Sequence, residues 1–288
     1  MPTHYIFIGN PGNGKSTLLN ILCNKNVFKA GHSVGKGLTT THKKYSIGDI
    51  TYMDTPGLND ADDCLRKQAS AEISKALKSG GDYKVVFVVG EKNGRVLAAD
   101  AATMNMVLDA APEIVKNKFG VIVNQASVKT VDLPPTGVGS QVAWSAFLFS
   151  QRPDVSTGHL LFLPRIAELE EVQSEKTNFG QVRGLQKIIL LMKFVNECPV
   201  INLTVPKVTE IDHRQIDVYA ARSKKKEEEL KKNRALLDEL ERQLEADRRQ
   251  WETEMGVVQQ IGASVVSGNY EIQWSGWVPT GMVVRLGR

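Results

Sequence analysis

The feature that most constrains the fold is a glycine-rich turn near the amino end, Gly9-Asn10-Pro11-Gly12-Asn13-Gly14-Lys15-Ser16-Thr17. It follows the apolar run Tyr5-Ile6-Phe7-Ile8 and precedes Leu18-Leu19-Asn20-Ile21-Leu22, so the segment is predicted to be a strand, a turn and a helix. In this setting the pattern G-x-x-x-x-G-K-[ST] binds the phosphates of a nucleotide. Its glycines can take positive φ and lack a Cβ, which lets backbone N–H groups surround a phosphate at the positive end of the helix.

The residues of this phosphate loop, residues 9–17, have distinct expected roles. Lys15 is expected to reach the β- and γ-phosphates, and Ser16 to hold Mg²⁺ through its hydroxyl. The remaining predicted nucleotide-binding residues of the loop are Asn10, Gly12, Asn13, Gly14 and Thr17. The alternative is an ordinary glycine turn, but the flanking strand and helix patterns make a chance match rare.

A second motif, Asp54-Thr55-Pro56-Gly57, follows a predicted hairpin over Tyr45 to Met53. A carboxylate at the end of a strand beside the phosphate-loop strand can hold a Mg²⁺-bound water, so Asp54 is expected at the metal. Gly57 offers its backbone N–H to a γ-phosphate, so the loop around it is released when that phosphate leaves. The motif therefore predicts a loop that senses a triphosphate.

The remaining predicted Mg²⁺ ligand is a threonine from the polar, glycine-punctuated loop that precedes the hairpin. Either Thr39 or Thr40 can supply it, and Thr39 is preferred. Lys15, Thr39 and Gly57 are therefore the expected catalytic residues. The expected metal ligands are Ser16, Thr39 and Asp54.

The phosphate loop, Thr39 and the run from Asp54 to Leu58 together resemble the septin-, Toc- and immunity-associated branch of the Ras-type GTPases. Gly94-Arg95-Val96-Leu97 with Asp100 looks like the box that follows the fourth core strand in the immunity-associated (AIG-type) members. The likeness covers about residues 3–124. It implies a P-loop GTPase fold of the α/β class, a mostly parallel sheet with helices on both faces, binding GTP or GDP with Mg²⁺. It also implies nucleotide-driven dimerisation through the switch face.

Two positions depart from this family pattern. Asn124 matches the first residue of the base-reading motif, but Ser127 stands where a carboxylate should accept from guanine. A hydroxyl lacks the charge and the second oxygen, so the choice between guanine and adenine stays open. Leu58 replaces a water-orienting glutamine, and hydrolysis should be slow unless His42, a partner or an activator supplies a polar group. The simpler interpretation of His42 is a surface residue.

Bulk properties limit the remaining function classes. The formal charge of +4 is mild and spread along the chain, so we expect no nucleic-acid partner, while weak peripheral contact with anionic membranes stays open. Three widely separated cysteines indicate a reducing compartment, and we expect a cytoplasmic protein. The first strand starts near Met1, leaving no room for a leader, and no apolar run approaches bilayer length.

The later core is predicted from apolar runs. A helix is expected over Ala101 to Ala111, a short helix over Gln141 to Phe149, and the last core strand over Leu160 to Leu163. A final amphipathic helix is expected over Gln181 to Val195. The apolar residues expected on its inner side are Leu185, Ile188, Ile189 and Met192.

The chain is predicted to divide into a GTPase domain over residues 1–205, a charged helical extension over 206–255 and a glycine- and β-rich tail over 256–288. One long helix is expected from His213 to Met255, since it contains hardly a glycine or proline. Its apolar residues recur every seven positions, at Leu230, Leu237, Leu244 and Trp251. Polar companion positions leave a solvated helix and a weak coiled coil for self-association equally open. A hairpin and a loosely ordered segment both fit the tail.

Overall fold

The structure is a computed structural model. It describes residues 2–31, 39–60, 62–92, 95–114, 119–131, 144, 148–149, 152, 155, 159–164, 185–203, 208–266, 271–278 and 281–287. The chain forms two compact units, Met1–Glu227 and Glu228–Arg288. The helix predicted over Gln141 to Phe149 lies mostly outside the described residues. The three-part division at residues 205 and 255 stays a prediction.

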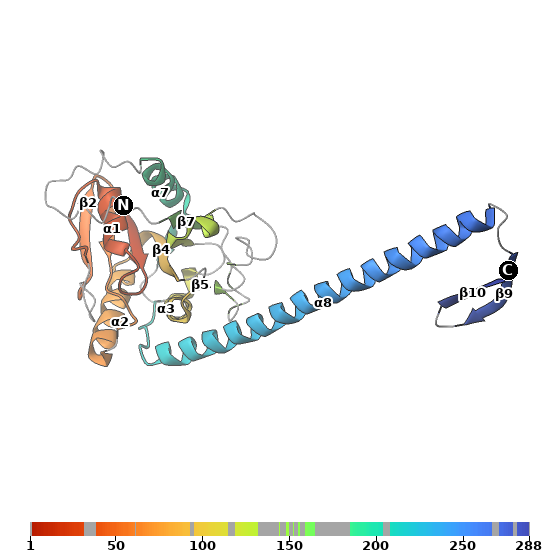
Figure 1. Ribbon diagram of the computed structural model, residues 1–288. Helices are drawn as coiled ribbons and strands as arrows, with labels where there is room; N and C mark the ends of the chain where they lie inside the picture. Colours follow the sequence, from red (N-terminus) through yellow and green to blue (C-terminus); the bar gives the residue numbers. More distant parts are fainter. Residues whose placement is uncertain are drawn as a thin grey trace. The chain divides into compact units, whose positions relative to one another are not determined.

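A single sheet with strand order β2-β3-β1-β4-β6-β7 forms the centre of the first unit (Figure 1). Strands β3, β1, β4, β6 and β7 run parallel, while β2 is antiparallel to β3. The predicted mostly parallel α/β sheet is therefore confirmed. The strands of this path are β1 Thr3–Ile8, β2 Lys43–Ile47, β3 Ile50–Asp54, β4 Gly81–Lys92, β6 Phe119–Ala126 and β7 Leu160–Pro164.

Two further short strands pair with β4. Strand β5 (Arg95–Val96) is antiparallel to the end of β4, and β8 (Ile201–Leu203) is antiparallel to its beginning. The strand predicted over Leu160 to Leu163 is confirmed as β7, but its place as the last core strand is wrong, because β8 follows it. A three-residue strand carries too little periodicity to be recognised from sequence.

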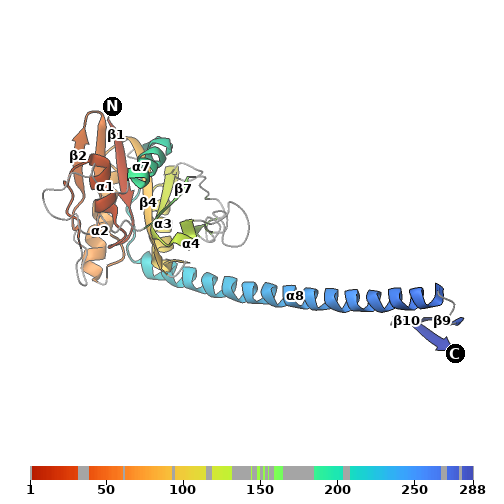
Figure 2. The same cartoon turned by 45° about the horizontal axis from the view of Figure 1, so that its top comes forward.

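Helices cover both faces of the sheet (Figure 2). Alternate residues of a strand point to opposite faces, and in β1 Ile6 and Ile8 pack with α2 and α3 while Tyr5 and Phe7 pack with α1 and α7. The predicted helix over Ala101 to Ala111 is confirmed as α3. The helices whose bounds lie within the described residues up to Leu203 are α1 Lys15–Cys23, α2 Asp63–Leu77, α3 Ala98–Ala110, η1 Pro112–Ile114, α4 Val128–Val131 and α7 Leu185–Glu197.

The predicted inner side of α7 is wrong at two of its four positions, and the side chain of Leu185 lies outside the described residues. Ile188 is buried as expected, but Ile189 and Met192 are 54% and 44% exposed. The residues that pack on the sheet with Ile188 are Leu191, Phe194 and Val195. The apolar run of this helix is nearly continuous, so its periodicity does not identify which stripe faces the core.

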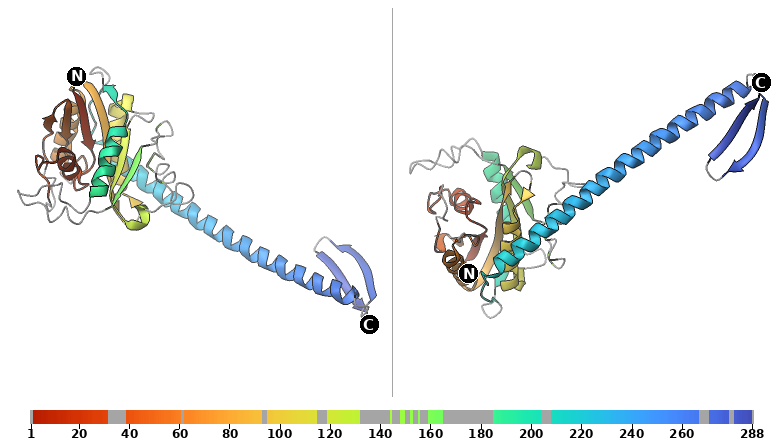
Figure 3. Two further views of the ribbon diagram at one scale, coloured as in Figure 1. Left: turned by 90° about the horizontal axis from the view of Figure 1, so that it is seen from above. Right: turned by 60° about the horizontal axis from the view of Figure 1, so that its bottom comes forward.

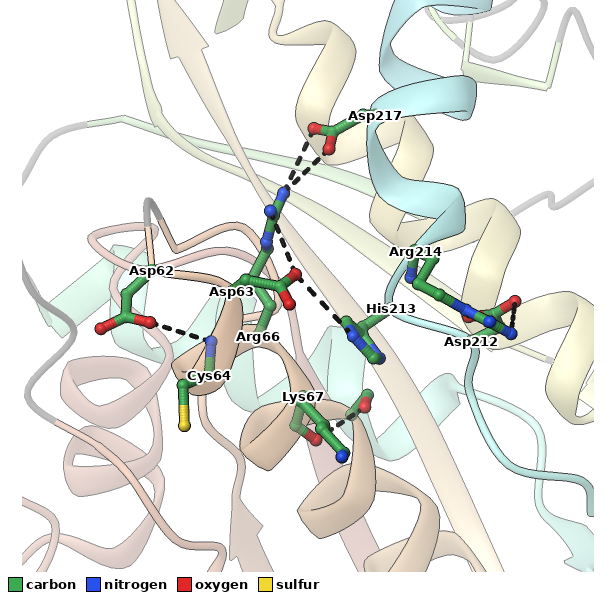
Figure 4. A network of polar contacts seen from close by, with 10 residues as sticks. Asp62, Asp63, Cys64, Arg66, Lys67, Asp212, His213, Arg214 and Asp217 are labelled. Carbon is green, nitrogen blue, oxygen red and sulfur yellow. Dashed lines mark hydrogen bonds and ion pairs between the residues drawn. The ribbon is translucent and has the colours of Figure 1, made fainter.

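The start of the C-terminal helix, α8 (Gln215–Val266), and the segment before it are both attached to α2. Arg66 of α2 contacts both carboxylate oxygens of Asp217, at 3.1 and 3.2 Å, and also pairs with Asp63 at 3.2 Å (Figure 4). Further along α2, the Ile211 N–H donates to Ser74 Oγ at 3.0 Å in a buried position. The start of α8 is thus part of the first unit.

Helix α8 is longer than predicted. The sequence pattern places the helix over His213 to Met255, whereas α8 runs from Gln215 through Gly256 to Val266. A single glycine costs only about 1 kcal/mol within a helix, so Gly256 does not end it. Three residues of the seven-residue repeat, Leu237, Leu244 and Trp251, are 57%, 72% and 61% exposed. No described helix has the length and hydropathy that a membrane span requires.

The later part of the predicted tail forms a hairpin, one of the two arrangements that the sequence left open. Strand β9 (Glu271–Val278) is antiparallel to β10 (Gly281–Gly287), with a register shift between Met282 and Val284 (Figure 3).

Candidate nucleotide site

The carboxyl ends of the parallel strands bring the sequence motifs to one edge of the sheet. The phosphate loop follows β1, Asp54 ends β3, and Asn124 lies near the end of β6. In β1 and β3, Phe7 and Asp54 are partners in register. This edge of a parallel sheet is where such folds bind their ligands.

The phosphate loop has the backbone shape that the motif predicts. Gly12 and Gly14 have φ values of +81° and +86°, and α1 begins directly after Gly14. A Cβ built on Gly14 would lie 2.4 Å from Asn124 Nδ2, whereas one built on Gly12 would meet nothing within 4 Å. Gly14 is therefore required both for its conformation and for space.

Lys15 lies folded over the loop. Its Nζ donates to the carbonyl oxygens of Gly9 and Asn10, each at 3.0 Å, and the side chain is buried. Burial lowers the pKa of Lys15, while the carboxylates of Asp54 and Asp100 act in the opposite direction. The ammonium is thus held at the loop, where a phosphate oxygen can meet it.

Ser16, Thr39 and Asp54 meet as the sequence predicts. Ser16 Oγ donates to Asp54 Oδ2 at 2.7 Å, and Thr39 Oγ1 donates to the same oxygen at 3.3 Å. Asp54 is 1% exposed, and among the described residues its Oδ1 is buried without a hydrogen-bond partner. Burial raises the pKa of Asp54, partly offset by Lys15 and the two hydroxyls.

This donor set fits Mg²⁺. The ion prefers hard oxygen ligands and is commonly bound through one or two carboxylates together with substrate phosphates. Two hydroxyls that converge on one carboxylate can turn their lone pairs to a cation. Asp54 Oδ1 can still accept a hydrogen bond. Ser16 and Thr39 would hold the ion directly, with Asp54 acting through a water.

The turn after Asp54 is packed directly on the phosphate loop. Thr55 Oγ1 donates to the Phe7 carbonyl oxygen at 2.7 Å, and a Cβ on Gly57 would lie only 2.2 Å from Pro11 Cδ. Leu58 is 1% exposed and belongs to the core cluster. The side chain at position 58 therefore serves packing and offers no polar group to the site.

Asn124 contacts the phosphate loop through its amide. Its Nδ2 donates to the Asn13 carbonyl oxygen at 2.8 Å, and the residue is buried. Ser127 instead caps α4, where its Oγ accepts from the Thr130 backbone N–H at 3.3 Å, and its own N–H donates to Glu91 at 2.9 Å. Of the two residues compared with a base-reading motif, only Asn124 contacts the loop.

His42 lies against α2 rather than alone on the surface. Its Nδ1 is 2.6 Å from Glu72 Oε2, and its backbone N–H donates to the same oxygen at 3.1 Å. Although burial acts in the opposite direction, these hydrogen bonds hold the pKa of Glu72 below its ordinary value. The ring is therefore engaged in joining the loop that carries Thr39 to α2.

Sequence reasoning missed the internal partners of the phosphate loop. The buried carboxylate of Asp100 accepts hydrogen bonds from Asn10 Nδ2 at 2.7 Å, Asn13 Nδ2 at 2.8 Å and the Gly90 N–H at 3.0 Å. Burial raises the pKa of Asp100, and these donors oppose the shift. Asn10 and Asn13 were predicted to bind nucleotide, but in the structure their side chains bind the protein.

The remaining predicted positions are less informative. Thr17 is half-buried beside Ser16 in the first turn of α1. Within the box that resembles immunity-associated GTPases, Gly94 lies outside the described residues and the backbone of Arg95 is in β5. The presence of Asp100 in that box was the only sequence signal for its contact with the loop.

A known family model matches part of the chain. Residues 4–125, less than half of the 288-residue chain, match the family model described as 50S ribosome-binding GTPase. The matched segment holds the phosphate loop, Thr39, Asp54 and Asn124. A search of curated proteins finds no match.

Solved structures of low identity are also similar. Era in complex with MgGDPNP and nucleotides of 16S ribosomal RNA is 15% identical with a TM-score of 0.40, covering 67% of this chain and 57% of Era. Toc33 from Arabidopsis thaliana with Mg²⁺ and GMPPNP is 15% identical with a TM-score of 0.44, covering 70% and 88%. NFeoB from S. thermophilus bound to GDP, AlF4⁻ and K⁺ is 14% identical with a TM-score of 0.37, covering 73% and 65%. The chain thus spans less than two thirds of Era.

Proposed function

We propose that the chain binds the magnesium complex of GTP and hydrolyses it slowly, with the segments around Thr39 and Gly57 acting as a conformational switch. The observation that carries the proposal is the meeting of Ser16, Thr39 and the buried Asp54 carboxylate beside the phosphate loop. The match of residues 4–125 to a GTPase family supports it. We also propose that the chain belongs to the immunity-associated branch of these GTPases.

Each residue would have a defined part. Lys15 would exchange its two carbonyl partners for phosphate oxygens, and the loop N–H groups around Gly12 and Gly14 would bind the β-phosphate. Gly57 would donate its N–H to the γ-phosphate, so the diphosphate state loses that contact. When bound, Mg²⁺ would be held by Ser16 and Thr39 beside the Asp54 carboxylate, and it would neutralise charge that develops during transfer.

Slow turnover follows from the packing of Leu58 and His42. Leu58 is in the core, and the His42 ring is bound to Glu72. Neither is placed to orient the attacking water, a part that a positioned polar group must take in fast enzymes. An activator or partner that supplies such a group would accelerate hydrolysis.

Binding and single-turnover phosphate release test this proposal together. Labelled GTP should bind in excess Mg²⁺ and release phosphate slowly after binding. If no nucleoside triphosphate binds at micromolar protein, the proposal is overturned.

Base preference needs its own experiment, because Ser127 caps α4 and offers no carboxylate. When GTP, GDP, ATP and ADP compete with one labelled nucleotide, the two guanine nucleotides should displace the label at lower concentrations than the adenine nucleotides. Equal or stronger competition by the adenine nucleotides would contradict the proposed preference for GTP. It would leave the proposed phosphate site unchanged.

A second candidate function is nucleotide-dependent self-assembly. It is favoured by the exposed apolar residues of α8, Leu237, Leu244 and Trp251. Light scattering should give a larger mass with a non-hydrolysable GTP analogue than with GDP. Leu244→Glu should abolish the difference, while Ala246→Glu, at an exposed position on another side of the helix, should keep it. Equal masses in both nucleotide states would remove this function.

A further inference from the structure

The side chain of Asn10 forms hydrogen bonds to three other residues inside the protein. Its Nδ2 donates to Asp100 Oδ1 at 2.7 Å, and its Oδ1 accepts from Thr103 Oγ1 at 2.7 Å and from the Asn59 backbone N–H at 3.1 Å. Asn10 itself is 5% exposed. Three elements therefore meet on one amide: the phosphate loop, α3, and the turn that carries Gly57.

The orientation of this amide is fixed by its partners. A carboxylate only accepts hydrogen bonds, so Asn10 must present Nδ2 to Asp100. Its Oδ1 is then left to face Thr103 and Asn59, both of which have a proton to donate. Asp100 is itself held by the Asn13 amide and the Gly90 N–H, which keeps the carboxylate in place.

Asn59 lies two residues beyond Gly57, the residue whose N–H would meet a γ-phosphate. Gly57 is packed so closely on Pro11 that no side chain fits between them. The turn is therefore attached to the phosphate loop at adjacent loop residues, by packing at Pro11 and by the hydrogen bond at Asn10. An attached turn needs less ordering when its ligand arrives, and a lower ordering cost raises affinity.

We propose that Asn10 is a positioning residue that holds the Gly57 turn against the phosphate loop and thereby sets the preference for triphosphate over diphosphate. The proposal rests on the nucleotide-binding function proposed above. Lys15, Ser16 and the loop N–H groups would contact both nucleotides, whereas the Gly57 N–H would contact only the triphosphate, at its γ-phosphate. Loss of the Asn10 side chain should consequently weaken triphosphate binding more than diphosphate binding.

The test compares the affinities of wild type and Asn10→Ala for a non-hydrolysable GTP analogue and for GDP, by titration calorimetry in excess Mg²⁺. One lost hydrogen bond of this kind should lower the triphosphate-to-diphosphate affinity ratio about fivefold. Asn13→Ala is the matched control. Asn13 is in the same loop and donates to the same Asp100, but its other bond goes to the Val88 carbonyl oxygen and not to the turn. Because it acts on Asn10 only through Asp100, Asn13→Ala should lower the affinity ratio less than Asn10→Ala does.

Thr103→Val keeps the experiment informative if Asn10→Ala folds poorly, because valine has nearly the shape of threonine and removes only the hydroxyl that fixes Asn10 Oδ1. It should lower the ratio by a smaller factor, with a thermal unfolding curve close to wild type. A ratio that is unchanged or raised in folded Asn10→Ala and Thr103→Val overturns the proposal. Wild type that binds neither nucleotide would instead overturn the proposed function.

Discussion

Ser16 and Asp54 are 38 residues apart in the sequence, yet Ser16 Oγ donates to Asp54 Oδ2 at 2.7 Å. The parallel pairing of β1 and β3 produces this contact, because it places Asp54 beside Phe7, two residues before the phosphate loop. The two motifs that the sequence predicts to share a metal ion are thereby joined through the sheet.

Lys15→Ala should lower triphosphate affinity roughly a hundredfold, because charge-assisted contacts to phosphate contribute about 1.5–3 kcal/mol each. Lys84→Ala is the matched control. Lys84 is also a buried lysine bound to two carbonyl oxygens, those of Val195 and Asn196, but these lie at the end of α7. It should lower stability and leave affinity intact. Wild-type affinity in folded Lys15→Ala would contradict the role of Lys15.

The two loop glycines should differ in their tolerance of alanine. Both have positive φ, so each substitution carries a backbone cost of about 1–2 kcal/mol. Only Gly14→Ala adds a clash, because its Cβ would lie 2.4 Å from Asn124 Nδ2. Gly14→Ala should therefore lose more nucleotide affinity than Gly12→Ala. Equal losses, measured by titration of both folded variants, would argue against this packing.

Ser74→Ala should destabilise the first unit by about 1–3 kcal/mol, because the buried N–H of Ile211 would lose its acceptor. Urea denaturation measures the change. Ser70→Ala is the control in the same helix: Ser70 Oγ only donates to the Lys67 carbonyl oxygen, and no main-chain donor depends on it in the described residues. A Ser74→Ala midpoint no lower than that of Ser70→Ala would show that the segment before α8 is attached differently.

Thiol chemistry should depend on burial. Cys64 is exposed, whereas burial raises the pKa values of Cys23 and Cys198 to about 12. At pH 8 roughly one in ten thousand of these buried thiols is ionised. An aromatic disulfide reagent should thus titrate one thiol per folded chain and three after denaturation. Rapid reaction of a second thiol in the folded protein would contradict the packing around α1 and α7.

The same two thiols give the stability a pH dependence. Their pKa is higher in the folded chain than the ordinary value of 9.0, so between about pH 9 and 12 the unfolded chain binds fewer protons than the folded one. The free energy of unfolding should therefore fall as pH rises through this window, and their contribution should be complete below it. Substituting both cysteines by alanine should flatten this part of a denaturation series. A slope unchanged by the double substitution would exclude these thiols as its source.

Local signals account for most of the site that the sequence predicts. The strand-turn-helix pattern around Lys15 and the hairpin leading into Asp54 are short-range features, and both are confirmed as secondary structure. Parallel pairing then brings them together without further information. The fold class could be predicted for the same reason.

Long-range contacts account for what sequence reasoning missed. The hydrogen bond between Asn10 and Asp100 joins residues 90 positions apart, and the periodicity of apolar residues in the sequence does not predict it. Helix α2, for which there was no sequence prediction, mixes lysine, serine and alanine over Asp63–Leu77, so its apolar stripe is weak. The inner side of α7 was mistaken because apolar residues occur around most of that helix.

Titration of labelled GTP against wild type and Ser16→Ala, in excess Mg²⁺ and in EDTA, tests the central claim most directly. Wild type should bind about tenfold or more tightly with Mg²⁺ than in EDTA. Ser16→Ala should bind equally in both conditions, near the wild-type value in EDTA, because the hydroxyl that holds the ion is gone. A metal-bound triphosphate at this loop would be contradicted if wild type had the same GTP affinity with Mg²⁺ and in EDTA. It would also be contradicted if Mg²⁺ raised the affinity of Ser16→Ala as much as that of wild type.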